Sequence, residues 1–329
     1  MPDYIFHIEI GDEFLSNTEK EIRDILNKNY NAFLLGLQGP DIFYYRAFFP
    51  GKNKKISKIV AEGLHKEKFS QYAYLILNGM KYFQGYLKVR SEKDLLFAYF
   101  TGFFTHLFTD LFFHPYIRYK TELYKRKYRT IWLHKKFEMN LDYAYVFSKN
   151  RRFSALEYVN KFKSTKGFSQ SISLFFSRIL KETYALDMSI CNISLIFGEA
   201  YRIMDFVLSF FEAKNPIKVR MIYPIIYFFL TGNSSMRFLT HPDREEFEDV
   251  LNQKHSPWTH LELSREYTFS VLELREMLID FLIDNTEKIY NFVYKNSNEY
   301  PEIFMRDYHF SKGVIYGNQK YGEEVSWFF

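Results

Sequence analysis

The stretch that decides the fold, residues 95–117, reads LLFAYFTGFFTHLFTDLFFHPYI. It is long and apolar enough to cross a bilayer as a helix, yet His106, Asp110 and His114 lie within it. An aspartate near the centre of a bilayer costs about 2.5–3.5 kcal/mol on insertion scales. We therefore expect a helix that is buried inside the protein and that Pro115 closes.

The three polar residues of this stretch follow i, i+4, i+8 spacing, which places them on one face of a helix. Burying a carboxylate among Phe and Leu side chains is unfavourable unless a cation compensates its charge. His134 and Glu138 repeat the i, i+4 spacing on a later helix. The pattern predicts a metal site whose ligands come from both helices.

Composition limits which site types are possible. The single cysteine, Cys191, excludes an intrachain disulfide and a zinc site built on several cysteines, so a metal must be held by His, Asp and Glu. The 44 basic and 39 acidic residues give a net charge of +5, which permits phosphate-bearing partners without requiring them. The 37 Phe and 27 Tyr residues predict a core built largely from aromatic rings.

Almost the whole chain has helical patterning, which predicts an all-α protein. Apolar and polar residues alternate, as in a strand, only at Tyr4–Ile10. Ser16 and Glu19 have the spacing of a capping box that opens a helix through Leu35. Further helices are expected near residues 55–67, 68–89 with a break at 78–79, 95–114, 131–147, 154–162, 169–186, 191–213, 217–231 and 264–297.

The length suits one large domain or one domain with a helical extension. We expect residues 1–150 to form a metal-binding catalytic core and residues 151–329 a helical C-terminal part packed on the same domain. The N-terminus lacks the basic region and apolar run of a signal peptide, so a cytoplasmic location is expected.

Three further residues are candidate ligands outside the two helices. Asp41 follows Gly39-Pro40 on a tight loop, His65 lies on a polar helix, and His7 lies in the segment HIEIG. Each alone also suits an ordinary role: Asp41 as a turn or cap residue, and His65 as a surface residue. A looser group, residues 255–260, contains two histidines and a tryptophan that we expect to be packing or surface residues.

Taken together, these motifs resemble the zinc-dependent phospholipase C family, which includes bacterial secreted phospholipases C and the N-terminal domain of glycosylphosphatidylinositol-specific phospholipase D. The resemblance covers roughly residues 4–145, where the order and spacing of the motifs match those of the family. The motifs are HIEIG with His7, Gly-Pro-Asp41, His65, His106-x3-Asp110-x3-His114 and His134-x3-Glu138. It implies a multihelical phospholipase C or zinc-nuclease-like fold with the metal site between core helices.

The resemblance also implies a division of the ligands between zinc ions. One zinc would be held by Asp41, His65, His106 and Asp110, and a second by His114, His134 and Glu138. In the family Asp110 would also bridge to a third zinc at His7, completed by the backbone of a processed N-terminal residue. Six residues precede His7 here, so two zinc ions are expected and the third is left open.

The resemblance further implies hydrolysis of a phospholipid or a related phosphodiester. Zinc makes a hydroxide nucleophile available at neutral pH. Asp41 is expected to serve either as a ligand or as the general base that orients the water, and Glu138 as a ligand. The basic stretch 118–129 either guides an anionic headgroup or peripheral membrane contact, or is a solvated loop.

Two other functions fit the same ligands. Zinc-dependent single-strand nucleases share the helical architecture, and their substrates stack on exposed aromatic rings. The Gly-Pro-Asp and HIEIG segments favour a phospholipase over a nuclease. A protein that keeps the metal but has lost catalysis, and acts as a metal-binding or membrane-surface module, is the remaining alternative.

Overall fold

A computed structural model describes residues 4–48, 52–82, 90–125, 133–163, 170–212, 247–316 and 326–327. Helices dominate these residues, which confirms the expected all-α class. The helices are α1 (Tyr4–Asn17), α2 (Lys20–Lys28), α3 (Tyr30–Gly36), α4 (Asp41–Phe48), α5 (Lys54–Lys66), α6 (Phe69–Lys81), α7 (Arg90–Lys125), α8 (Leu133–Ser148), α9 (Ala155–Lys163), α10 (Gln170–Tyr184), α11 (Ile190–Glu212) and α13 (Val271–Tyr294). Two antiparallel hairpins, β1 (Trp258–His260) with β2 (Arg265–Tyr267) and β3 (Asp307–His309) with β4 (Val314–Tyr316), and two 3₁₀ turns, η2 (Glu302–Met305) and η3 (Phe310–Lys312), complete them.

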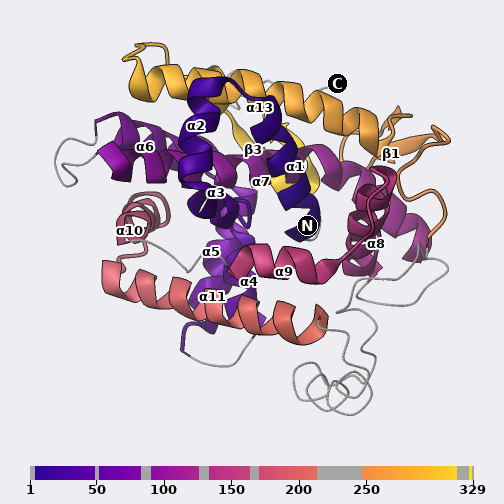
Figure 1. Ribbon diagram of the computed structural model, residues 1–329, viewed down its shortest axis with the longest axis horizontal. Coiled ribbons are helices and arrows are strands. Elements are labelled where there is room, and N and C mark those ends of the chain that lie inside the picture. Colours follow the sequence, from indigo (N-terminus) through magenta and orange to yellow (C-terminus); the bar gives the residue numbers. More distant parts are fainter. Residues whose placement is uncertain are drawn as a thin grey trace.

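Helix α7 is the centre of the molecule. Figure 1 shows it between α13 along one edge and α11 along the opposite edge. Among the described residues, it is the one helix long and apolar enough to cross a membrane, and 94% of its most apolar window is buried inside the protein. Its partners are α1, α2, α3, α6, α8, α10, α13, β1 and η3. The expectation of a buried core helix at residues 95–117 is confirmed.

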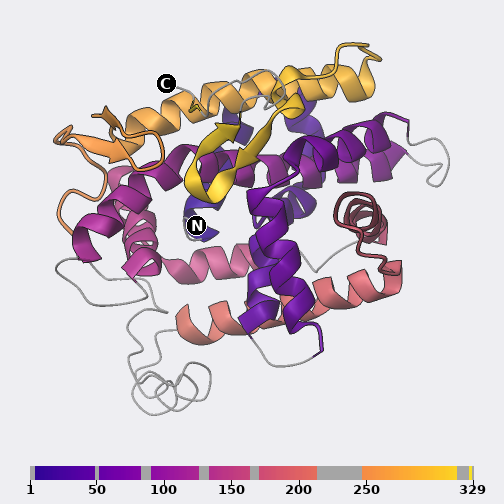
Figure 2. The ribbon, with the colours of Figure 1, turned by 180° about the vertical axis from the view of Figure 1, so that it is seen from behind.

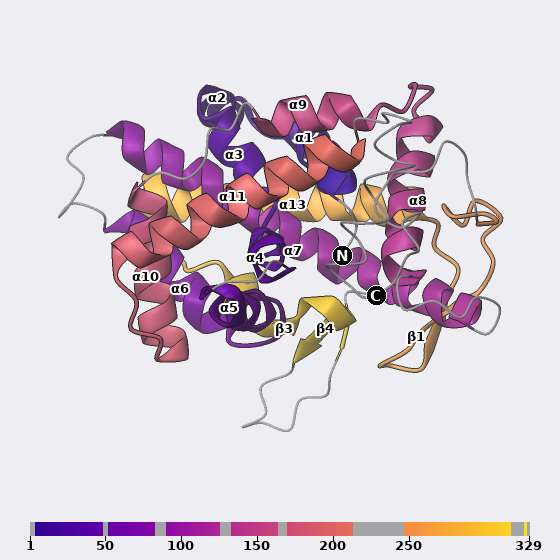
Figure 3. The same cartoon turned by 90° about the horizontal axis from the view of Figure 1, so that it is seen from below.

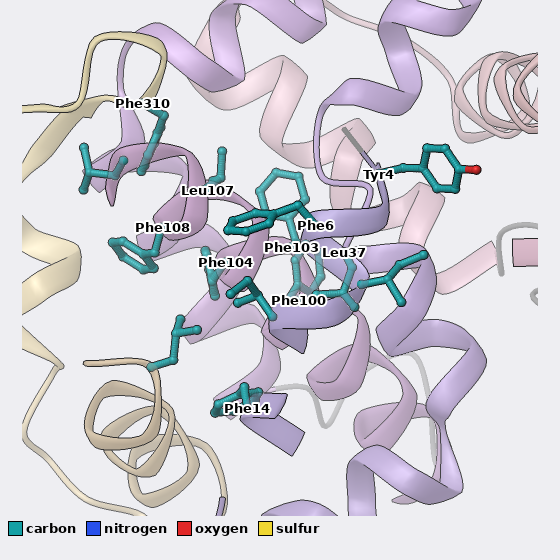
Figure 4. Close-up of a cluster of buried hydrophobic side chains, with 14 of the residues drawn as sticks. Tyr4, Phe6, Phe14, Leu37, Phe100, Phe103, Phe104, Leu107, Phe108 and Phe310 are labelled. Atoms are coloured by element: carbon teal, nitrogen blue, oxygen red, sulfur yellow. The ribbon is translucent and has the colours of Figure 1, made fainter. Parts of the chain in front are cut away.

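Aromatic rings and one glycine explain how so many elements pack on α7. Figure 4 shows Phe100, Phe103, Phe104 and Phe108 of α7 gathered with side chains from other elements. At Gly102 a Cβ atom would lie 2.2 Å from the carbonyl oxygen of Phe33, so α3 and α7 cross with their backbones in direct contact.

The N-terminal segment differs from its expected structure. Residues Tyr4–Ile10 belong to helix α1, and every one of them is buried. A helix that is covered on all sides needs no polar face, so its sequence lacks the 3.6-residue period. The predicted capping box is also wrong. Ser16 lies inside α1, where its hydroxyl donates to the carbonyl of Asp12, and α2 begins only at Lys20.

Pro115 does not close α7, which continues to Lys125. A proline has no N–H for the carbonyl four residues earlier, here that of Leu111. The indole Nε1 of Trp327 donates to this carbonyl instead, at 3.1 Å. The C-terminal end of the chain thus satisfies the group that the proline leaves open. The basic residues 118–125 are therefore helical, and residues 126–129 lie outside the described residues.

The remaining differences are at helix boundaries. Helix α6 shows no break at Gly79, and α13 begins at Val271, later than expected, because residues 265–267 form β2. The helix expected at 217–231 lies outside the described residues. Helices from both parts of the chain pack together: α11 on α4, and α13 on α1, α6 and α7. Seen from behind in Figure 2, the β3–β4 hairpin lies beside α5 and α7.

Candidate metal centre

Five helices bring the eight candidate ligands together. His7 comes from α1, Asp41 from the first position of α4, and His65 from the last turn of α5. Helix α7 supplies three ligands and α8 two; they are His106, Asp110, His114, His134 and Glu138. Seven of the eight residues are buried, and the side chain of His134 is 38% exposed.

The first group is built around Asp110. One of its carboxylate oxygens, Oδ2, lies 3.5 Å from Nε2 of His65 and 3.6 Å from Nε2 of His106. Asp41 Oδ1 lies 3.1 Å from the same His65 nitrogen and 3.8 Å from that of His106. The other oxygen of Asp110 is 3.5 Å from Nε2 of His7, whose ring stacks on that of His106.

These separations are those of ligands around one cation. Two atoms that each lie about 2.0–2.1 Å from a tetrahedral zinc are about 3.3–3.4 Å apart. Nε2 of His65 and His106, Oδ1 of Asp41 and both oxygens of Asp110 are buried without a hydrogen-bond partner among the described residues. Buried polar atoms are rarely left so, which marks a position for a cation. The donor set therefore fits zinc.

The second group lies one turn further along α7. One atom each from His114, His134 and Glu138 lies within 4.8 Å of the others, with 2.9 Å between His134 Nε2 and Glu138 Oε1. The ring of His114 stacks on that of His134 at 5.9 Å. Asp110 links the groups, since Nδ1 of His114 is 4.0 Å from its Oδ2. Because His134 is the most exposed ligand, this group faces solvent.

Backbone carbonyls fix three of the histidines in one tautomer. Nδ1 of His65 donates to the carbonyl of Ala61 at 2.7 Å, and Nδ1 of His106 donates to that of Leu37 at 3.0 Å. Nδ1 of His114 donates to the carbonyl of Phe310 at 3.0 Å. The proton then lies on Nδ1, and the lone pair of Nε2 is available for a metal, an arrangement found in most histidine metal sites.

The turn before Asp41 is shaped by Gly39. Its φ is +52°, and a Cβ atom there would lie 2.2 Å from the ring of His106. Only glycine allows both this backbone conformation and this approach. The turn therefore places Asp41 at the start of α4 and against His106 at once.

Burial sets the charges of the centre. It lowers the pKa of His106 and of His114 well below the usual value, so both rings are neutral, as metal ligation requires. Burial raises the pKa of Asp110 to about 7. For His65 burial opposes protonation, but contact with Asp110 and Asp41 outweighs it and raises the pKa to about 9. A metal cation would take the place of this proton.

The structure thus brings all eight expected ligands into two adjoining groups. The group at residues 255–260 lies apart: Trp258 and His260 are buried, Nε2 of His260 donates to the carbonyl of Gly313 at 2.9 Å, and His255 is exposed. The sequence reading missed the carbonyls of Leu37 and Phe310. It also missed Tyr44, one turn after Asp41, whose ring stacks on His65 at 5.8 Å. A carbonyl occurs at every residue and gives no sequence signal.

A family model described as zinc dependent phospholipase C matches residues 6–186, which include all eight ligands. The chain belongs to the zinc dependent phospholipase C family. Its helical architecture is that expected from the resemblance, with the ligands between core helices. Membership supports a zinc hydrolase, and the two ligand groups suit that metal. No curated protein and no solved structure matches the chain.

Proposed function

We propose that this member of the zinc dependent phospholipase C family hydrolyses a phosphodiester bond in a phospholipid. The observation that carries the proposal is the convergence of Asp41, His65, His106 and Asp110 on one point, with a second ligand group one helical turn away. Adjacent metal positions of this kind suit in-line displacement at phosphorus.

The residues divide the work as follows. One zinc would be held by the first group, which consists of His65, His106, Asp110 and Asp41. The other zinc would be held by the second group, which includes His114. Zinc, when bound, lowers the pKa of a water toward 7 and offsets the charge of the phosphoryl oxygens. The side chain of Asp41 is 12% exposed, in contrast to the fully covered Asp110. Asp41 can therefore also orient the attacking water, whereas Asp110 would serve only as a metal ligand.

A third zinc at His7 is part of the proposal. His7 Nε2 faces Asp110 Oδ1, and both belong to a candidate group with His106. The phospholipid substrate, peripheral membrane contact, the cytoplasmic location and the boundary near residue 150 stay predictions. The single-strand nuclease and the inactive module are the alternatives to be excluded.

Three substrates separate these functions: bis-p-nitrophenyl phosphate, phosphatidylcholine vesicles and single-stranded DNA, each with zinc-loaded protein. We expect turnover of the first two. Turnover of DNA alone would favour the nuclease. Bound zinc without turnover of any substrate would favour the module and overturn the proposal. A chelator-treated sample, tested before and after zinc is restored, is the control for metal dependence.

A further inference from the structure

Three cations and a histidine lie along one edge of the metal centre. We name Lys66, Arg118, His309 and Lys312 the cationic edge. Each lies within four residues, along the chain, of a residue that builds the centre. Lys66 follows His65, and Arg118 lies one helical turn, a rise of about 6 Å, beyond His114. His309 and Lys312 flank Phe310, whose carbonyl holds the ring of His114.

Ion pairs with two carboxylates fix the cations of this edge. Arg118 Nη2 lies 2.9 Å from Glu262, and Lys312 Nζ lies 3.2 Å from the same carboxylate. Lys66 Nζ lies 3.5 Å from Glu62. β3 and η3 pack against α5, and η3 also packs against α7, so the edge spans four elements: α5, α7, β3 and η3. Figure 3 shows β3 beside α5 from below.

The edge has positive charge and hydrogen-bonding capacity to spare. Its three cations face two carboxylates, Glu62 and Glu262, and Nδ1 of His309 is buried without a hydrogen-bond partner among the described residues. Burial and the nearby cations lower the pKa of His309 to about 4, so the ring is neutral at physiological pH and has one N–H to donate.

We propose that the cationic edge binds a phosphomonoester group on the headgroup of the lipid whose phosphodiester occupies the metal centre. A phosphomonoester carries nearly two negative charges and three acceptor oxygens. The planar fork of Arg118 matches two of these oxygens. The inference rests on the proposed function for the identity of the reacting group, and it deepens that function by assigning an anionic headgroup.

Substitutions of Arg118 and of its ion-pair partner Glu262 should change lipid binding in opposite directions, which provides the test. Full-length, zinc-loaded protein is sedimented with phosphatidylcholine vesicles that contain either a phosphatidylinositol monophosphate or phosphatidylserine at equal surface charge. We expect the wild type to favour the phosphomonoester. Arg118→Gln and Lys312→Gln should each weaken that binding, by about tenfold for Arg118. Glu262→Gln should strengthen it, because it releases both cations. Lys288→Gln, at an exposed pair with Asp284 on α13, is the matched control and should change nothing.

Three outcomes would overturn the inference: equal binding to both vesicles, a Glu262→Gln variant that binds more weakly, or competition by inorganic phosphate without preference for either lipid. The last would assign the edge to free phosphate. Melting temperatures identify variants that fail to fold. If Arg118→Gln on α7 and Lys312→Gln on η3 both weaken vesicle binding, misfolding of a single variant does not explain the result.

The binding readout needs no turnover. If the wild type hydrolyses no phosphodiester but the variants shift binding in opposite directions, the edge stands and the proposed function fails. If it hydrolyses phospholipids and the variants shift nothing, only this inference fails.

Discussion

The two ends of the chain serve the metal centre in opposite ways. Among the described residues, every member of the candidate groups lies between His7 and Glu138. The segment after residue 247 contributes no member, yet the carbonyl of Phe310 orients His114 and the indole of Trp327 completes the hydrogen bonding of α7. The first region supplies the candidate ligands, and the second orients one of them and stabilises α7. Substitutions in the two regions should therefore fail in different ways.

The largest effect is expected for Asp110→Asn. Asp110 faces four histidines, and an amide removes both its charge and one acceptor oxygen. Zinc content should fall, and activity should drop by more than about a hundredfold. Asp94→Asn on the same helix is the control, because its oxygen accepts only a neutral hydrogen bond from Tyr294 and an amide oxygen can replace it. Unchanged activity in Asp110→Asn would contradict the assignment of these residues as ligands of a catalytic metal.

Gly39→Ala should give the next largest effect. The added methyl group would meet the ring of His106, and the positive φ would cost about 1–2 kcal/mol. We expect zinc affinity to fall by about 10–100-fold in a competition assay with a chelator. Gly198→Ala in α11 is the control, since nothing lies near its Cβ position and alanine favours a helix. Equal affinity in both variants would show that the turn does not position His106.

Trp327→Phe tests the supporting region. The change keeps an aromatic ring but leaves the carbonyl of Leu111 without its donor, so the free energy of unfolding should fall by about 1–3 kcal/mol. In a Pro115→Ala background the new N–H of residue 115 can donate to this carbonyl. Trp327→Phe should then lower the free energy of unfolding by less. A double-mutant cycle by denaturant unfolding measures the difference. Equal losses in both backgrounds would contradict the role given to Trp327.

Glu13→Gln should give the smallest effect, a change in how stability depends on pH. This residue of α1 pairs with Arg275 of α13 and, at 3.2 Å, with Lys149. Burial opposes ionisation, but Lys149, Tyr145 and Arg275 outweigh it and lower the pKa of Glu13 below 4.5. Its contribution is therefore complete above about pH 4.5 and is lost as the pH falls through the lowered value. Melting temperatures should fall less steeply with acid in Glu13→Gln than in the wild type, whereas the exposed Glu276→Gln should follow the wild type.

Local spacing could be predicted from the sequence, whereas long-range contacts could not. His106, Asp110 and His114 stand out because ionisable side chains at four-residue spacing are costly in an apolar helix. The helix over residues 4–10 was not predicted, because every one of these residues is buried and the segment has no 3.6-residue period. Helix α7 continues past Pro115 because Trp327 donates to the carbonyl of Leu111. These two residues are 216 positions apart, so no local sequence pattern indicates the contact. Phe310 acts through its backbone, so its side chain carries no signal.

The most direct test of the central claim is the zinc content of purified protein after zinc loading and dialysis, measured by elemental analysis of the wild type and of His134→Gln. We expect at least two equivalents in the wild type and the loss of one in the variant, because His134 belongs only to the second group. Less than one equivalent in the wild type would contradict the claim.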